Sequence, residues 1–238
     1  MYQFGEKHPV IFESFLTIAA FLVAIAVIIP GNILNLHPDL TSSVGRIVAG
    51  LLLLLLYRRA FTGRNPDASF AVLLPALLFA AWNLYYNLSS GASFGGAVFF
   101  TEALLTAASP AIFEEVLFRG IFLYNLKKKG HGDLASMLLS AVFFAAVHLT
   151  NLVGQELAAV ALQAVYSLVI GMVLAAIYLR NNSISEVILV HFLIDYTNRL
   201  YIEPAASASA LQMVLFAVLL AAEAVYALLV VRKKERSV

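Results

Sequence analysis

Long apolar blocks separated by short polar breaks dominate this sequence and leave few folds open to it. Stretches of roughly 15–22 mainly apolar residues recur along the chain, and each is long enough to cross or nearly cross a bilayer core of ~30 Å at ~1.5 Å per residue. Only 12% of the 238 residues are charged, about half the share of a soluble domain. We therefore predict an all-α polytopic membrane protein, a bundle of about eight transmembrane helices with a polar site inside the membrane.

Turn-forming residues mark the ends of these predicted spans. Pro30-Gly31, Asn65-Pro66-Asp67 and Asn181-Asn182-Ser183 are examples, and such residues favour chain reversal. The predicted spans are about 10–29, 44–57, 70–88, 97–123, 134–153, 157–179, 184–199 and 209–231. We expect a single integral membrane domain over residues 1–238, with a motif-bearing core at about 97–199 and accessory spans at about 10–88 and 209–231.

Lysine and arginine are distributed unevenly among the predicted loops. They collect in the N-terminal tail, in alternate loops and in the C-terminal tail, at Lys7, Arg58, Arg59, Arg64, Lys127, Lys128, Lys129, Arg180, Arg232, Lys233, Lys234 and Arg236. The positive-inside rule then predicts that both termini are cytoplasmic, which requires an even number of spans. A short chain of this kind is typical of a bacterial protein, so we expect a multi-pass protein of the inner (plasma) membrane.

The fourth predicted span contains three ionisable residues within six positions, Glu114, Glu115 and Arg119. A charge at this depth costs from ~2.5 to over ~10 kcal/mol, so such residues usually have a function. Glu115 and Arg119 are four residues apart on a helix and can pair, whereas Glu114 is rotated by about 100° from Glu115. A structural ion pair accounts for Glu115 and Arg119 and leaves Glu114 unexplained.

Two later spans each carry a polar residue one helical turn from a partner. Phe144 and His148 share a face of the fifth span, and His191 and Asp195 share a face of the seventh. A lone histidine in an apolar helix is often only a hydrogen-bonded core residue. Glu114, His148 and His191 nevertheless all fall near the middle of their spans, so we expect the three helices to form one shared site.

These three groups resemble the signatures of a known family. Glu114-Glu115-Val116-Leu117-Phe118-Arg119 resembles EExxxR, Phe144-Ala145-Ala146-Val147-His148 resembles FxxxH, and His191-Phe192-Leu193-Ile194-Asp195 resembles HxxxN/D. In this order and on separate spans, they are similar to the CPBP family of intramembrane proteases, which includes CAAX proteases and bacteriocin-processing (Abi) proteins. The resemblance covers about Thr101 to Arg199.

The resemblance implies an endopeptidase with named catalytic residues. Glu114 would activate a water molecule as general base, and His148 would help to hold that water. Glu115 and Arg119 would shape the site. The expected substrate is a membrane-associated peptide or protein, and we expect no nucleic-acid partner; oligomeric state is not predicted.

The third motif leaves the need for a metal open. His191 and Asp195 would stabilise the oxyanion or help to hold a metal. Family members that act as glutamate proteases carry Asn in place of Asp195, and an ionised carboxylate can only accept hydrogen bonds. The cofactor is thus either none or zinc, whose possible ligands are Glu114, His148, His191 and Asp195. The absence of cysteine excludes thiolate ligands, thiolate catalysis and disulfides.

Two functions without proteolysis also fit an intramembrane polar site. One is a catalytically inactive scaffold or immunity protein, because a fold does not guarantee activity. The other is a proton-coupled transporter, which also uses intramembrane acids and histidines. A transporter would usually show interrupted spans in both halves of the chain, whereas the acids and histidines of the predicted site are confined to residues 114–195.

Overall fold

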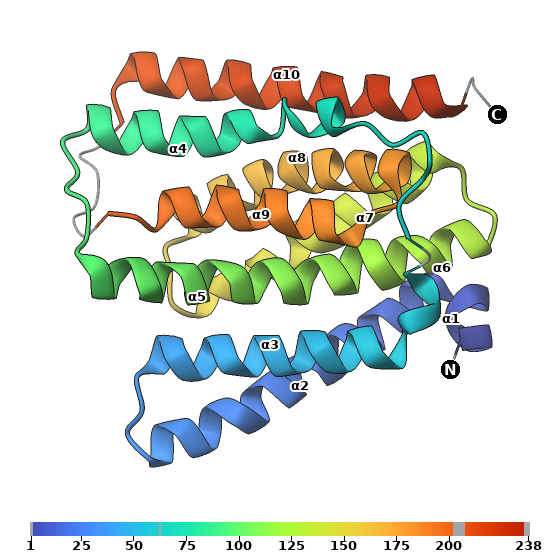
Figure 1. Cartoon of the computed structure of the whole chain (residues 1–238), viewed down its shortest axis with the longest axis horizontal. Helices are drawn as coiled ribbons and strands as arrows, with labels where there is room; N and C mark the ends of the chain where they lie inside the picture. Colours follow the sequence, from blue (N-terminus) through green and yellow to red (C-terminus); the bar gives the residue numbers. More distant parts are fainter. Residues whose placement is uncertain (1, 62, 202–207, 236–238) are drawn as a thin grey trace.

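The structure, a computed structural model, describes residues 2–61, 63–201 and 208–235. Every regular element in these ranges is a helix, and long helices lie side by side with both chain ends at the same end of the bundle (Figure 1). In chain order they are α1 (Tyr2–Lys7), α2 (Pro9–Ile33), α3 (Pro38–Leu56), η1 (Arg58–Ala60), η2 (Phe70–Leu73), α4 (Leu77–Ser89), α5 (Ala97–Glu115), η3 (Val116–Phe122), α6 (Leu123–Lys128), α7 (Asp133–Val147), η4 (His148–Val153), α8 (Leu157–Asn181), α9 (Ile184–Asn198) and α10 (Ala210–Glu235).

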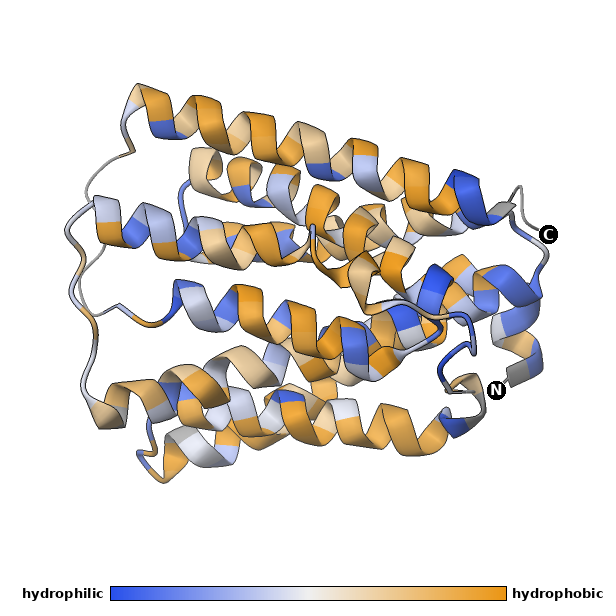
Figure 2. Cartoon of the chain, turned by 45° about the horizontal axis from the view of Figure 1, so that its top comes forward, coloured by the Kyte–Doolittle hydropathy of each residue, from blue (hydrophilic) through white to orange (hydrophobic). Residues whose placement is uncertain are grey.

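Six helical segments in the described ranges are long and apolar enough to cross a membrane. They are Pro9–Gly31, Pro38–Leu56, Phe70–Ser89, Asp133–Val153, Leu157–Asn181 and Ala210–Lys234. The protein is therefore an all-α, multi-pass membrane protein, as predicted. Apolar residues run along the middle of these helices and polar residues collect toward their ends (Figure 2).

The prediction of about eight spans needs adjustment at two of them. The predicted spans 97–123 and 184–199 do not belong to the six, because the first carries four charged residues and α9 has only 15 residues. Both nevertheless lie alongside the other helices (Figure 1). The charged residues that could form the site are the reason why the first falls short on composition.

Three features near the N-terminus differ from the predicted ones. α2 continues through Pro30 to Ile33, so the turn predicted at Pro30-Gly31 is wrong: the helix ends four residues later than predicted. α3 begins at Pro38, six residues before the predicted start, with Pro38 and Asp39 in its first turn. Proline suits the first helical position because its missing N–H would have no helical partner there. The short helix α1 was not predicted; it packs on α2 and α6.

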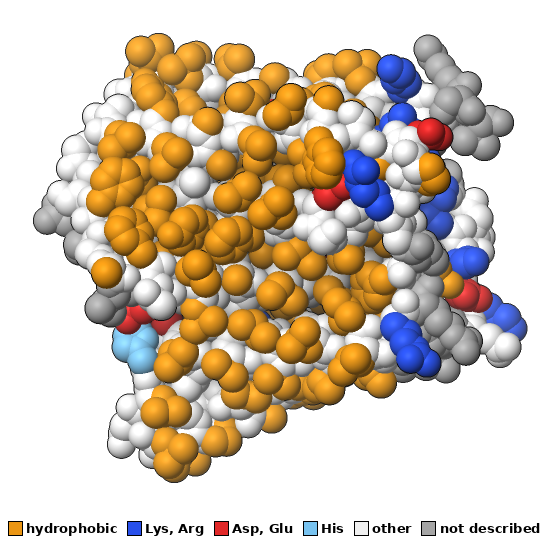
Figure 3. All heavy atoms as spheres, in the orientation of Figure 1, with side chains coloured by type: hydrophobic (Ala, Val, Ile, Leu, Met, Phe, Trp, Pro, Cys, Tyr) orange, Lys and Arg blue, Asp and Glu red, His pale blue; other side chains and the backbone are white. Residues whose placement is uncertain are grey.

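α8 lies at the centre of the bundle, and α2 and α10 lie at its periphery. In its most apolar 18-residue stretch α8 is 56% buried, against 22% for α2 and 17% for α10. Apolar side chains cover the visible outer face, and lysine and arginine gather at the end that holds both termini (Figure 3). We refer to this as the basic end. The charge segregation fits the loop pattern read from the sequence.

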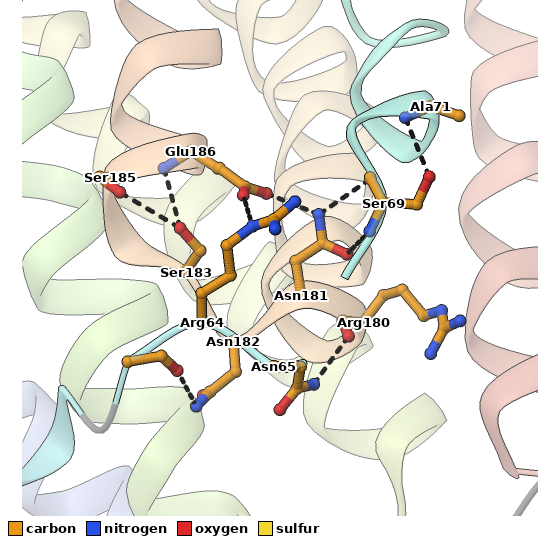
Figure 4. A network of polar contacts seen from close by, with 11 residues as sticks. Arg64, Asn65, Ser69, Ala71, Arg180, Asn181, Asn182, Ser183, Ser185 and Glu186 are labelled. Carbon is orange, nitrogen blue, oxygen red and sulfur yellow. Dashed lines mark hydrogen bonds and ion pairs between the residues drawn. The ribbon is translucent and has the colours of Figure 1, made fainter. Parts of the chain in front are cut away.

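The turn between α8 and α9 is fixed by a polar network at the basic end (Figure 4). Glu186 accepts a hydrogen bond from Arg64 on one oxygen and from Asn181 on the other. Asn181 also bonds the backbone of Ser69 in both directions, at 3.1 and 3.3 Å. Asn182 ends α8 in the left-handed conformation at φ 52°, which asparagine tolerates well. The network sets α8 and α9 antiparallel and so fixes the level of His191.

Candidate active site

Glu115 and Arg119 form the predicted ion pair in the interior of the protein. Arg119 Nη1 donates to Glu115 Oε1 at 2.8 Å, and neither side chain is exposed. Arg119 Nη2 donates to the carbonyl of Gly171 on α8 at 3.2 Å. A buried charge pair is tolerated only when further hydrogen bonds satisfy it, and Gly171 supplies one of them.

The helix changes geometry directly after the two glutamates. Residues Val116–Phe122 form a π-helix between α5 and α6, and all seven are buried. Ser140 on α7 donates a hydrogen bond to the carbonyl of Phe118 at 3.2 Å within this segment. π-Helical turns are rare and often occur at functional sites. Here the π-helix includes Arg119, the last residue of the first motif.

His191 joins the ion pair from α9. Its Nδ1 lies 2.7 Å from Glu115 Oε1, and since a carboxylate can only accept, the imidazole donates. Glu115 Oε1 therefore accepts from both Arg119 and His191. The other ring nitrogen, Nε2, lies 3.9 Å from Glu114 Oε2 and 3.8 Å from Asp195 Oδ1.

Phe144 is the aromatic centre of the site. The guanidinium of Arg119 lies over its ring at 4.3 Å, a favourable cation–π arrangement. Its ring also makes edge-on contacts with those of Phe118, His148 and His191, with centroid separations of 5.6, 5.0 and 5.9 Å. Phe144 thus packs against side chains from all three motifs.

His148 is held by the residue one turn before it. Its Nδ1 lies 2.8 Å from the carbonyl of Phe144, so that nitrogen carries the hydrogen and donates it. In the neutral ring Nε2 is then left with a free lone pair. His148 begins the short helix η4, and Asn151 of η4 donates to Gln163 on α8 at 2.8 Å.

A cavity of about 290 Å³ brings the predicted residues together. Glu114, His148, His191 and Asp195 all line it, with Glu114 18% and Asp195 25% exposed. Glu115 is not exposed at all. The two adjacent glutamates therefore differ as the helical geometry predicts: one is part of a buried ion pair and the other faces open space.

The residues do not form an evident metal centre. Within the described ranges, no group of three or more histidine, cysteine, aspartate or glutamate side chains is arranged to hold a metal ion. His191 Nδ1 is engaged by Glu115. His191 Nε2 approaches the carboxylates of Glu114 and Asp195. The zinc site considered from the sequence stays a prediction, and we derive no step through a metal.

Three residues of the site were not assigned a role from the sequence. Phe144 was noted only as part of a motif, and Gly171 and Ser140 were not noted. A Cβ on Gly171 would lie 3.1 Å from Ala141 and 3.2 Å from Phe144, so glycine allows α8 to approach α7 closely. For Gly171, the only signal in the sequence was a glycine inside an apolar span, because small residues mark close contacts between helices.

Comparison with known proteins agrees with the motifs. A family model described as type II CAAX prenyl endopeptidase Rce1-like matches residues 97–197. This range begins with α5, ends one residue before the end of α9 and contains all three motifs. No curated protein and no solved structure matches the chain significantly. Residues 97–197 of the chain are thus similar to the CAAX protease family.

Proposed function

We propose that the protein is an intramembrane endopeptidase in which Glu114 activates the attacking water. The observation that carries this proposal is the difference between the two glutamates. Glu115 has a buried arginine and a histidine as partners, whereas Glu114 faces the cavity beside His191 and makes no hydrogen bond to any described residue. A carboxylate that makes no structural hydrogen bond and borders open space is available for proton transfer.

The proposed reaction uses three side chains that line the cavity. Glu114 takes a proton from water while the water oxygen attacks the peptide carbonyl, and His148 Nε2 accepts the second hydrogen bond of that water. His191 Nε2, protonated, donates to the oxyanion. The proton held by Glu114 then passes to the leaving nitrogen, the C–N bond breaks, and the products are a carboxylic acid, which keeps the second water proton, and an amine.

Glu115 and Arg119 are positioning residues in this scheme. They fix the Nδ1 side of His191 and so direct its Nε2 toward the cavity. Residues that contact the groups of an active site commonly orient them in this way. Asp195 lies 3.8 Å from the same Nε2, where its negative charge favours the protonated ring.

We propose a membrane-associated peptide or protein as the substrate and the plasma membrane of a bacterium as the location, with both termini cytoplasmic. The support is the gathering of lysine and arginine at the end with both termini (Figure 3). The absence of cysteine allows a direct test. Gln155→Cys, just after η4, should react with an impermeant maleimide in intact cells, whereas Lys128→Cys at the basic end should react only after permeabilisation. The reverse pattern would contradict the proposed orientation.

The function is tested by mapping newly exposed peptide termini in membranes of cells that carry wild-type protein or Glu114→Gln at equal abundance. We expect termini that occur only with the wild type, because removal of a general base typically costs ~10²–10⁴-fold in rate. Glu156→Gln, an exposed glutamate at the start of α8, is the matched control and should retain them. Identical termini from wild type and Glu114→Gln would contradict the role of Glu114. No wild-type-specific termini at all would indicate an inactive scaffold.

A further inference from the structure

The cavity that holds the site reaches toward the end of the bundle opposite the termini. α7 begins at Asp133, which pairs with Lys127 and Lys234 at the basic end, and runs away from that end to η4. Besides the central residues, the cavity wall includes Thr150 and Asn151 of η4, and Asn198 and Arg199 at the far end of α9. The site is therefore continuous with the end of the bundle opposite the termini.

Two arginines line this cavity. Arg46 comes from α3 and is half-buried, and Arg199 directly follows α9 and is exposed. Within the described ranges, neither guanidinium has an ion pair or a side-chain hydrogen bond, in contrast to Arg64 and Arg119, which each pair with a glutamate.

The acidic groups nearby do not neutralise them. Glu114 and Asp195 line the same cavity, and Asp39 and Glu102 line a neighbouring pocket that Arg199 also borders. No oxygen of these four carboxylates lies within 4.0 Å of either described guanidinium. Two guanidinium groups thus border the cavity without a carboxylate partner among the described residues.

We propose that Arg46 and Arg199 bind a carboxylate of the substrate. Guanidinium groups bind carboxylates in bidentate geometry, and such charge-assisted bonds are about twice as strong as neutral ones. The partial burial of Arg46 strengthens such an interaction further. The carboxylate is either an acidic side chain near the scissile bond or the C-terminus of the peptide. This inference rests on the proposed peptidase function and names the substrate class.

The small size of the cavity suits a short peptide segment. Its volume of about 290 Å³ is close to the lower end of the ~300–1,000 Å³ typical of ligand sites. Gln163, Asn151 and Tyr166 also line it, so amide and hydroxyl groups are available to the peptide backbone. A carboxylate held by the arginines would fix which peptide bond reaches Glu114.

The test measures binding and therefore does not depend on turnover. Four dansylated apolar tetrapeptides are compared, with Glu or Gln at the third position and a free or amidated C-terminus. Their affinities for purified Glu114→Gln protein in nanodiscs are measured by fluorescence anisotropy. We expect at least one class of carboxylate to bind about tenfold or more tightly than the neutral probe. Comparison of the Glu with the Gln probes, and of the free with the amidated C-termini, shows which carboxylate the arginines bind.

The arginines are then replaced in the same background. Arg46→Gln and Arg199→Gln should abolish the preference for the acidic probe, Arg199→Lys should retain part of it, and Arg58→Gln, an exposed arginine at the basic end, should retain all of it. Equal binding of all four probes, no binding of any, or a preference that survives both glutamine variants would overturn the inference. A preference without wild-type-specific termini would instead retain the subsite and reject the peptidase.

Discussion

The protein contains two buried glutamates that each bind an arginine, one in the site and one at the α8–α9 turn. At the turn both oxygens of Glu186 have partners, and Arg64 is 38% exposed. In the site Arg119 and Glu115 are completely buried, yet Glu115 Oε2 and Arg119 Nε have no hydrogen-bond partner among the described residues. The polar groups of Glu186 are thus satisfied and those of the site pair are not. Buried polar groups without partners are uncommon in native proteins, and here they lie beside the proposed catalytic residues.

The largest effect is expected from Glu115→Gln. This change leaves Arg119 buried without its counter-charge, which typically costs about 3–5 kcal/mol. Glu114→Gln, at the neighbouring position, should change the free energy of unfolding by less than about 1 kcal/mol because Glu114 is partly exposed and makes no hydrogen bond to a described residue. Thermal unfolding of both variants in detergent provides the comparison. Equal losses would mean that both glutamates are structural.

A double replacement sharpens the same point. Glu115→Gln combined with Arg119→Met removes both charges, so part of the stability lost in the single variant should return. The interaction free energy from this cycle is expected to be clearly larger than for two distant sites. Additive losses would show that the two side chains contribute independently.

A smaller effect is expected at the turn. Glu186→Gln should cost about 1–2 kcal/mol, because Arg64 can reach water when its partner loses its charge. Arg64→Lys should cost less still, since an ammonium group can replace the single hydrogen bond. Chemical unfolding of these variants and of Glu115→Gln ranks them by their loss in free energy of unfolding. A loss at Glu186 as large as that at Glu115 would remove the contrast between the two pairs.

The smallest effect is expected from Ser140→Ala. Ser140 donates to Phe118 in the π-helix, and loss of one such bond typically costs about 0.5–1.5 kcal/mol. Ser136 lies one turn earlier on α7, is equally buried, and its hydroxyl has no partner among the described residues. Ser136→Ala should therefore be neutral or stabilising. The pair of variants isolates the contribution of the bond, and a loss only in Ser136→Ala would contradict it.

Helical periodicity accounts for what could be predicted of the site. The i,i+4 relation of Glu115 to Arg119 and the separate direction of Glu114 follow from 3.6 residues per turn, and the structure shows both. Because Glu114, His148 and His191 each fall near the middle of a predicted span, they were expected to form one site. In the structure all three line one cavity. Their catalytic roles remain predictions.

Features that depend on contacts between helices could not be predicted in this way. The π-helix at 116–122 has no local sequence signal, because it depends on contacts such as the one from Ser140. The sharing of Glu115 Oε1 between Arg119 and His191 depends on how α5 and α9 dock. Six of the eight predicted spans are long and apolar enough to cross a membrane within the described ranges. The two others carry the first and third motifs, and they fall short because one is highly charged and the other is short.

The shared oxygen of Glu115 has a consequence for how such proteins can diverge. Arg119 and His191 both depend on it, so a single replacement of any of the three leaves a buried group without its partner, and selection for folding alone would preserve them. No buried group depends on Glu114 for a hydrogen bond. A descendant that lost proteolysis could replace Glu114 and still keep the rest of the first motif. Within this architecture, the identity of residue 114 is therefore a better indicator of activity than the motif as a whole.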